Sequence, residues 1–519
     1  MNKNFSYRKN YLQTYFWQAV SILLGFASLF IVVPYLSSNK VLYGIYSVCT
    51  SLTIFFSYAD LGFLSAGVKY AAEYYIRGER EQEMKVIGFT AFIMLSVFSV
   101  LALVMVYLGF NPTIVIPELE PGTDNFYIAR ALLLTLAISC PVIIAQRILS
   151  IVFTIRVEDF IYQRFNIVGN ICRIISVFFF FGAGSYRVVE YYIFYQLMSL
   201  AVVIAALIYT RRYGYNVIEF IKTIHFDKAI FDKVKAISGT SLIMTVSMIF
   251  YYELDQVFIS NLLGIEAVAI YGAAISVLTL IRQFSSVVYS PYTSRYNHYA
   301  GLKDYNGLSN FVRTMVYTFT PVIVLPIVAV SLFASPFINS WIGPEYADSA
   351  ILVSFLVLCF TPNCLRDPIS AYFVAMERNR TLIKYNVILP IIYWLGIIAT
   401  IKLWGLSSFA VFKTVAPMIV TIGFWKLINN EFREKGFEPL GLSRFLKTLF
   451  MPIIALVIFR FSTESLVSYD HTKIGLFQNI AVIGFGVVVS MIIAIFCNNT
   501  LRGLVQSYLG SILSKLKKR

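Results

Sequence analysis

Apolar residues run along this chain in long segments that are separated by short polar loops. A helix needs about 20 mainly apolar residues to cross the hydrocarbon core of a bilayer, and about fourteen segments of the chain approach that length. The pattern predicts an all-α, polytopic membrane protein. The expected spans are 12–34, 43–68, 86–108, 127–153, 165–182, 189–210, 237–262, 267–290, 311–333, 348–373, 385–402, 407–428, 446–461 and 476–496.

A weak internal repeat predicts how these helices are grouped. Residues 33–47 align with residues 261–275, and each copy contains a Tyr-Gly pair that opens a span. Identity is thin, so coincidence is the alternative, but the register places the first span on the seventh, as in transporters built from parallel repeats. We therefore expect an N-terminal six-helix lobe, a cytoplasmic amphipathic linker, a second parallel six-helix lobe and two additional helices. Their ranges are 1–210, 211–236, 237–428 and 446–496.

Composition and charge support a membrane protein. The 519 residues are 58% hydrophobic and 13% charged, with a mean hydropathy of +0.74, which is far from the norm for soluble proteins. A net charge of +15 is compatible with nucleic-acid binding, but the Lys and Arg residues lie mainly in loops. With the N-terminus in the cytoplasm, most of them fall in cytoplasmic loops, as the positive-inside rule requires. We expect both termini in the cytoplasm, a bacterial cytoplasmic membrane location and no nucleic-acid partner.

Residues with catalytic or metal-binding chemistry are sparse. The six cysteines lack CxxC spacing and the three histidines lie in loops, so we expect no metal site and no cofactor. The longest loop, 211–236, is too short to form a catalytic domain. Function is therefore expected to reside in the helix bundle, and the chain is not expected to be an enzyme.

Polar residues recur within several spans at steps of three and four residues, which places them on one face of each helix. One alternative is that small polar residues only allow helices to pack closely. We favour a hydrated cavity, because the polar faces fall on corresponding helices of the two halves. The residues expected to line it are Gln18, Thr50, Ser57, Asp60, Asn170 and Gln283.

Four arginines fall in the cytoplasmic half of their spans. Each charge within the membrane costs about 2.5–3.5 kcal/mol and needs water or a partner. Guanidinium groups bind phosphate through paired donors, so we expect a cluster that binds a dianionic or more highly charged substrate head, with Asp60 as a counter-charge. For Arg147 and Arg366 the alternative is that they extend to the inner interface. Arg366 also has Asp367 beside it and nearby prolines, which suits a broken helix with a local ion pair. The four are Arg147, Arg173, Arg282 and Arg366.

Two further charges fall at similar depth in the outer half of the membrane. Asp255 lies in the seventh span and Lys413 in the twelfth. We favour an ion pair between them within the C-terminal half. If they do not pair, Asp255 is a candidate for coupling to Na⁺ or H⁺.

Short motifs in the second and seventh spans, together with the length and span count, resemble a known family. The polysaccharide transporter family, which comprises O-antigen and capsule repeat-unit flippases, shows similar motifs and belongs to the multidrug/oligosaccharidyl-lipid/polysaccharide exporter superfamily. The motifs are Tyr43-Gly44, Asp60-Leu61-Gly62 and Lys69-Tyr70, then Leu254 to Ile259, Leu263-Gly264 and Tyr271-Gly272.

The resemblance implies a flippase that moves polyprenyl-pyrophosphate-linked oligosaccharide from the inner to the outer leaflet by alternating access. It also implies membrane lipids as partners, and a polysaccharide polymerase with its chain-length machinery. Lipid II is a less expected cargo, because its flippases carry basic residues on the first span, where this chain has Gln13 and Gln18.

Three other functions are weaker interpretations. A cation-coupled drug or metabolite antiporter of the same superfamily would favour carboxylates over arginines in the cavity. An envelope polymerase or ligase would need a large external loop with Arg or His. A scaffold protein would not need polar faces on matched helices.

Overall fold

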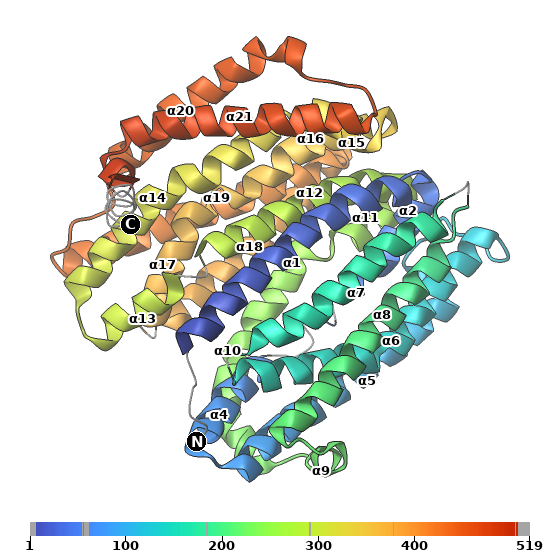
Figure 1. Cartoon of the computed structure of the whole chain (residues 1–519). Coiled ribbons are helices and arrows are strands. Elements are labelled where there is room, and N and C mark those ends of the chain that lie inside the picture. Colours follow the sequence, from blue (N-terminus) through green and yellow to red (C-terminus); the bar gives the residue numbers. More distant parts are fainter. Residues whose placement is uncertain are drawn as a thin grey trace, which may run out of the picture. The chain divides into compact units, whose positions relative to one another are not determined.

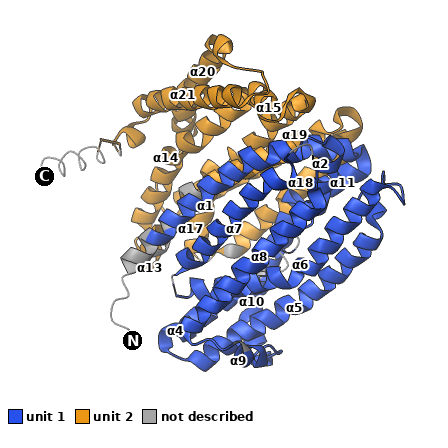
Figure 2. Ribbon diagram, turned by 45° about the vertical axis from the view of Figure 1, so that its right-hand side comes forward, with its two compact units in different colours: residues 1–272 blue, residues 273–519 orange. Residues whose placement is uncertain are grey.

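The computed structural model is built from helices, and the described residues contain no strand (Figure 1). It describes residues 7–53, 56, 62–156, 158–182, 185–289, 292–376, 378–503 and 505–506. The chain divides into two compact units, Met1–Gly272 and Ala273–Arg519, which are blue and orange in Figure 2. Each unit has its own packing and is described separately.

The first unit is held together by packing between long helices. Helix α5 packs on α4 and α6, α1 packs on α7, and α8 packs on α6 and α7. The turn between α4 and α5 is tight because Gly78 adopts φ 75°, and its N–H donates to carbonyls of the last turn of α4. The helices are α1 (Tyr7–Leu36), α2 (Lys40–Ser51), α4 (Phe63–Arg77), α5 (Arg80–Phe110), α6 (Asp124–Thr154), α7 (Asp159–Phe180), α8 (Val188–Thr210), α9 (Val217–Lys222), α10 (Lys228–Tyr252) and α11 (Asp255–Leu263).

The second unit begins within helix α12 (Ile265–Tyr289). Helix α14 is central, because α17, α20 and α21 all pack on it, while α18 packs on α19. The remaining helices are α13 (Thr293–Gly301), α14 (Tyr305–Leu332), α15 (Ala334–Ile342), α16 (Ala347–Leu356), α17 (Asn363–Ala375), α18 (Asn379–Trp404), α19 (Ser407–Glu434), α20 (Leu442–Ser462) and α21 (Lys473–Cys497).

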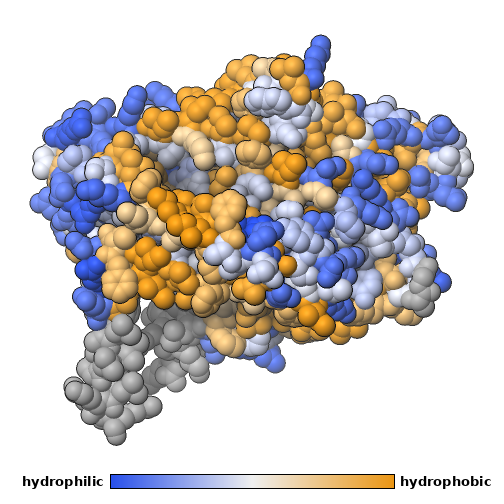
Figure 3. Space-filling model, turned by 90° about the horizontal axis from the view of Figure 1, so that it is seen from above, coloured by the Kyte–Doolittle hydropathy of each residue, from blue (hydrophilic) through white to orange (hydrophobic). Residues whose placement is uncertain are grey.

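Twelve helices of the described chain are long and apolar enough to span a membrane, so the chain is a multi-pass integral membrane protein. Of the other two expected spans, 43–68 contains residues outside the described set. The other, 165–182, lies in α7, whose arginines and asparagines lower its hydropathy. Figure 3 shows hydrophobic residues over broad areas of one face, with strongly hydrophilic residues mainly toward its left and right edges.

Two expected spans are broken in the structure. The predicted span 237–262 consists of α10 and α11, which are separated at Glu253 and Leu254. The predicted span 348–373 consists of α16, a 3₁₀ turn at Val357–Phe360 and α17. Pro362 has no N–H group to donate to the carbonyl four residues earlier, Leu358, which interrupts the α-helical hydrogen bonds at the second break. The apolar pattern continues through both breaks and so did not predict them.

The compact units and the expected lobes divide the chain at different places. Helices α10 and α11 pack on α4 and α2, so they belong to the first unit although the repeat assigns them to the second lobe. The linker 211–236 is not one helix. It contains a 3₁₀ turn, helix α9 and the start of α10, where the Asp227 carboxylate accepts two backbone N–H groups as the N-cap. The lobes follow from the repeat and stay a prediction.

Helices α20 and α21 are fixed to the second unit by a hydrophobic cluster and by one buried amide. Leu325 and Ala329 of α14 pack against Leu456 of α20 and Ala494 of α21. The amide nitrogen of Asn479 on α21 donates to Pro336 O and Ser340 Oγ of α15, each at 2.9 Å. The last two helices are therefore an integral part of this unit.

Replacing Asn479 by Ala is expected to lower the melting temperature in detergent. The change leaves several buried polar groups without their partner, which costs about 1–3 kcal/mol for each unsatisfied group. The control is Gln478→Ala, because Gln478 is exposed and its amide donates only to the Leu466 carbonyl. Equal melting temperatures for the two variants would contradict this role of Asn479.

Candidate functional site

Arg173 lies on α7 in a setting of neutral partners. Its guanidinium donates to Asn170 Oδ1 at 2.8 Å and to Ser199 Oγ at 2.6 Å, and it lies 4.0 Å from the ring centroid of Tyr195. The Nε atom is buried and has no hydrogen-bond partner among the described residues. Among the described residues, no carboxylate forms an ion pair with Arg173, and the predicted counter-charge Asp60 lies outside them.

Arg147, on α6, lies near the same place. The Tyr162 phenol on α7 is within electrostatic range of both Arg147 and Arg173 and also bonds to Asn166. The described part of the chain offers Arg147 no carboxylate partner either. We call Arg147, Tyr162, Asn170, Arg173, Tyr195 and Ser199 the Arg173 cluster. Two of the four predicted arginines, on α6 and α7, therefore lie within electrostatic range of the same phenol, and α8 contributes Tyr195 and Ser199.

Tyrosines from α2 and α8 continue this polar region. Tyr46 meets Tyr192 edge-on with ring centroids 6.0 Å apart, and Tyr192 stacks on Tyr195 at 6.3 Å. Tyr46 and Tyr195 are partly exposed, whereas Tyr192 is buried. Each phenol offers a ring face and a hydroxyl, the two features that a sugar ring with its C–H and O–H groups can use. The sequence did not identify this aromatic surface.

Of the other cavity residues predicted in the first unit, two are described by the structure and two are not. Thr50 is partly exposed and its hydroxyl donates to the Tyr46 carbonyl one turn earlier, and Gln18 on α1 is also partly exposed. Ser57 and Asp60 lie outside the described residues, so the role of Asp60 as a counter-charge stays a prediction.

The remaining predicted arginines, Arg282 on α12 and Arg366 on α17, belong to the second unit. Arg366 is buried and its Nε lies 3.8 Å from the carboxylate of Asp367, at the start of the short helix that follows the break. The expected broken helix with a local ion pair is thus present. Arg282 and Gln283 are partly exposed. A common site for all four arginines stays a prediction.

Asp255 and Lys413 are both buried, at 1% and 0% exposure. The break between α10 and α11 places Asp255 in the first turn of α11, where the helix dipole favours a negative charge, and Tyr271 donates a hydrogen bond to its carboxylate. The Lys413 ammonium lies 5.3 Å from the ring centroid of Tyr393. Asp255 lies in the first unit and Lys413 in the second, and their pairing stays a prediction.

A buried ion network, which sequence reasoning missed, joins three loops at one end of the first unit. Glu83 is 1% exposed and accepts from Arg156 Nη2 at 2.9 Å, from Arg80 Nη1 at 3.0 Å and from the Tyr215 hydroxyl. Burial raises the pKa of Tyr215 to about 12, with Arg156 opposing the rise, so the phenol keeps its proton and remains a donor. We call Glu83, Arg80, Arg156 and Tyr215 the Glu83 network.

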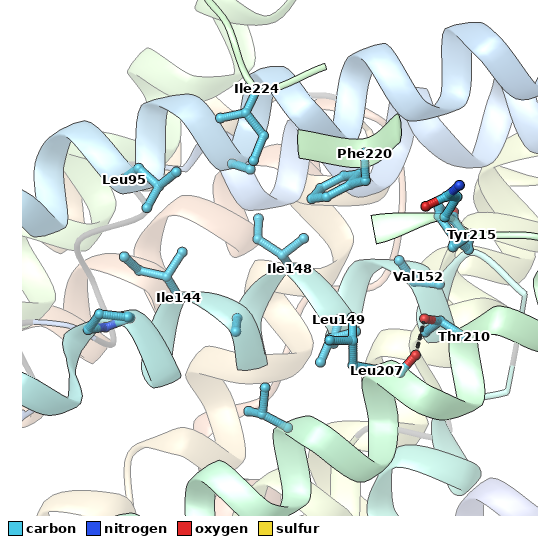
Figure 4. Close-up of a pocket in the computed structure, with 15 residues that line it drawn as sticks. Leu95, Ile144, Ile148, Leu149, Val152, Leu207, Thr210, Tyr215, Phe220 and Ile224 are labelled. Carbon is cyan, nitrogen blue, oxygen red and sulfur yellow. Dashed lines mark hydrogen bonds between the residues drawn. The ribbon is translucent and has the colours of Figure 1, made fainter. Parts of the chain in front are cut away.

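An apolar cavity of about 250 Å³ lies beside this network (Figure 4). Leu95 of α5, Ile144 and Ile148 of α6 and Leu207 of α8 line it, and Phe220 of α9 covers it from another side. Its walls are almost entirely aliphatic and aromatic, so it is suited to hydrocarbon rather than to a polar solute.

The contacts of Glu83 with Arg156 and Tyr215 were missed because these residues are 73 and 132 positions away from it in the sequence. All three sit at the ends of apolar segments, where polar and charged residues are ordinary. The sequence offered one sign of the Glu83 network, which is the number of charged residues in the loops after α4, α6 and α8. All three loops are expected on the cytoplasmic side of the membrane.

A family comparison decides the identity of the chain. The model of the family described as "Polysaccharide biosynthesis protein" matches residues 8–297, which is more than half of the sequence. The chain belongs to this polysaccharide biosynthesis protein family. The MatE family model also matches residues 241–396. No curated protein sequence matches the chain.

Solved structures show the same fold in relatives of this polysaccharide biosynthesis protein. "Lipid II flippase MurJ, inward closed conformation" has a TM-score of 0.66 at 15% identity, with 92% of this chain and 98% of that chain covered. An inward-facing multidrug resistance MATE family transporter of the MOP superfamily has a TM-score of 0.55 at 13% identity, with coverages of 79% and 93%. The predicted family resemblance and fold class are confirmed.

Glu83→Gln is expected to destabilise the protein strongly. Removing the carboxylate leaves the 4%-exposed Arg156 without its counter-charge, and breaking a buried pair costs about 3–5 kcal/mol. Thermal unfolding in detergent measures the effect, and the double variant with Arg156→Gln should lose less than the sum of the single losses. The control is Glu81→Gln, whose pair with Lys85 is exposed and screened by solvent and therefore contributes little to stability. A loss no larger than that of the control would contradict the network.

Proposed function

We propose that this protein is a flippase that moves polyprenyl-pyrophosphate-linked oligosaccharide across the cytoplasmic membrane for surface polysaccharide biosynthesis. The observation that supports this most is the pair of arginines around Tyr162, neither of which has a described carboxylate partner. Two uncompensated positive charges within a helix bundle are costly unless water or an anion reaches them. A pyrophosphate supplies the matching negative charge and several acceptors for guanidinium donors.

The tyrosines beside the Arg173 cluster support a glycan on the same cargo. In our proposal the pyrophosphate contacts Arg173 and Arg147, the first sugars lie along Tyr195 and Tyr46, and the polyprenyl tail stays in lipid. Arg282, Arg366 and Gln283 of the second unit complete the path. The termini lie in the cytoplasm, and polymerase with chain-length machinery accepts the product on the outer side.

A cation-coupled drug or metabolite antiporter is the second candidate. The MatE match over residues 241–396 and the buried carboxylate of Asp255 favour it. The Arg173 cluster disfavours a cationic cargo, because like charges repel in a medium of low dielectric constant. We therefore place the anionic cargo at the Arg173 cluster, and Asp255 would take a coupling ion, Na⁺ or H⁺, only if it does not pair with Lys413.

Arg173→Ala and Arg147→Ala are each expected to reduce delivery of the glycan to the outer leaflet by about ten- to a hundredfold, since a hydrogen bond to a charged group is worth about 1.5–3 kcal/mol. Mass spectrometry of the polyprenyl-pyrophosphate lipids, with a test of leaflet, measures delivery at matched protein levels. The control is Arg130→Ala, which lies on α6 with Arg147 but near the other end, over the Phe110 ring. Full delivery by both cluster variants would remove these arginines from the site.

The Asp255 and Lys413 variants test the proposed ion pair. Asp255→Asn and Lys413→Ala should each impair transport or folding, because each leaves a buried charge without its partner. The double variant should be less impaired than the product of the two single effects. Simple multiplication of the single effects would argue against the pair and favour Asp255 as an independent coupling site.

A further inference from the structure

Two pockets of opposite character adjoin at one end of the first unit. The apolar cavity lies between α5, α6 and α8, with α9 over it (Figure 4). A second pocket, of about 300 Å³, is lined by Tyr75, Gly78, Arg80, Glu83, Arg156 and Tyr213. It is therefore bounded by the loop between α4 and α5, the end of α6 and the turn after α8.

Tyr215 forms the boundary between the two pockets. Its ring lines the apolar cavity, while the Arg80 guanidinium lies 3.6 Å from the ring centroid and the Tyr215 hydroxyl donates to Glu83. Arg156 also reaches both sides, because its Nη1 donates at 2.9 Å to the carbonyl of Val152, a residue that lines the apolar cavity. A ligand with a charged head and a hydrocarbon chain can thus contact both pockets at once.

The polar pocket carries a small excess of positive charge. Two guanidinium groups, of Arg80 and Arg156, face one carboxylate, that of Glu83. Glu158 accepts a hydrogen bond from the Tyr213 hydroxyl, and neither Glu158 nor Glu79 lines the pocket. The excess of one charge matches a single phosphodiester, whereas a pyrophosphate would bring more negative charge than the pocket balances.

The apolar cavity opens where lipid can enter it. Leu95 and Leu207 line the cavity and are each 37% exposed, on helices long and apolar enough to span the membrane. Helix α9 also exposes Ile218 and Ile221, at 67% and 58%, which suits a helix lying at the membrane interface. Hydrocarbon from the surrounding bilayer can therefore reach the cavity from the side.

We propose that this double pocket is a binding site for an anionic membrane phospholipid of the phosphatidylglycerol type, separate from the transport path. Its phosphodiester lies against Arg80 and Arg156, and one acyl chain occupies the cavity beside Ile148. The bound lipid fills the space beneath α9 and links the loops that the Glu83 network joins.

Native mass spectrometry of the purified full chain tests the site with phosphatidylglycerol and phosphatidylcholine of identical acyl chains. The protein should retain one phosphatidylglycerol more tightly than any phosphatidylcholine, by about fivefold for one uncompensated basic charge. Glycerophosphoglycerol, which has the same phosphodiester head without acyl chains, should not bind. Equal retention of the two lipids, or binding of glycerophosphoglycerol alone, would overturn the proposal.

Two variants test the two halves of the site separately. Arg80→Gln keeps the pairing of Glu83 with Arg156 and should weaken phosphatidylglycerol binding about fivefold. Its control is Arg77→Gln, because Arg77 is exposed at the same end but does not line the pocket. Ala145→Leu adds carbon atoms to the apolar cavity and should weaken binding of both lipids by about tenfold, since each buried methylene contributes to chain binding.

A melting curve without added lipid checks the fold of each variant. Should Ala145→Leu fail to fold, the comparison of Arg80→Gln with Arg77→Gln still decides the case. Unchanged phosphatidylglycerol retention in Arg80→Gln, or an equal loss in Arg77→Gln, would contradict the proposed site. Transport of the glycan is not a readout here, so failure of this site leaves the flippase proposal standing.

Discussion

The cost of placing charge in a hydrocarbon environment determines much of this structure. An ionised group in the bundle must find an opposite charge, a set of neutral dipoles or water. Glu83 takes the first solution with Arg156, and Arg366 does the same with Asp367. Arg173 takes the second, with an amide, a hydroxyl and an aromatic ring. The two solutions have different consequences, because a paired charge fixes the fold whereas an uncompensated one attracts an anion.

Both solutions occur within the first unit, on neighbouring helices. Helix α6 carries Arg147 in its second half, and the paired Arg156 follows two residues after the helix ends. The Glu83 network holds together the start of α5, the end of α6 and the segment after α8. A protein that moves a charged headgroup past these helices needs such fixed points, because binding requires donors that are already positioned.

The sequence predicted the all-α membrane fold because hydropathy over about 20 residues is a strong signal, and it predicted the family from short motifs. It predicted Arg147 and Arg173 in the cytoplasmic half of the membrane, and their place in one site stays a prediction. The prolines near Arg366 predicted a broken helix there, whereas the continuous apolar pattern before Asp255 did not predict the break between α10 and α11. Nor did it predict the Glu83 network or the tyrosines of α8 beside Arg173, because these contacts join distant segments and depend on helix packing.

Flipping by the purified protein in lipid vesicles tests the central claim most directly. Vesicles would carry a polyprenyl-pyrophosphate-linked oligosaccharide in one leaflet, and a glycan-modifying reagent that cannot cross the membrane would report its arrival in the other. The account predicts transfer that is fast with the wild-type protein and slow with Arg173→Ala. Transfer no faster than in protein-free vesicles, or equal for the two proteins, would contradict it.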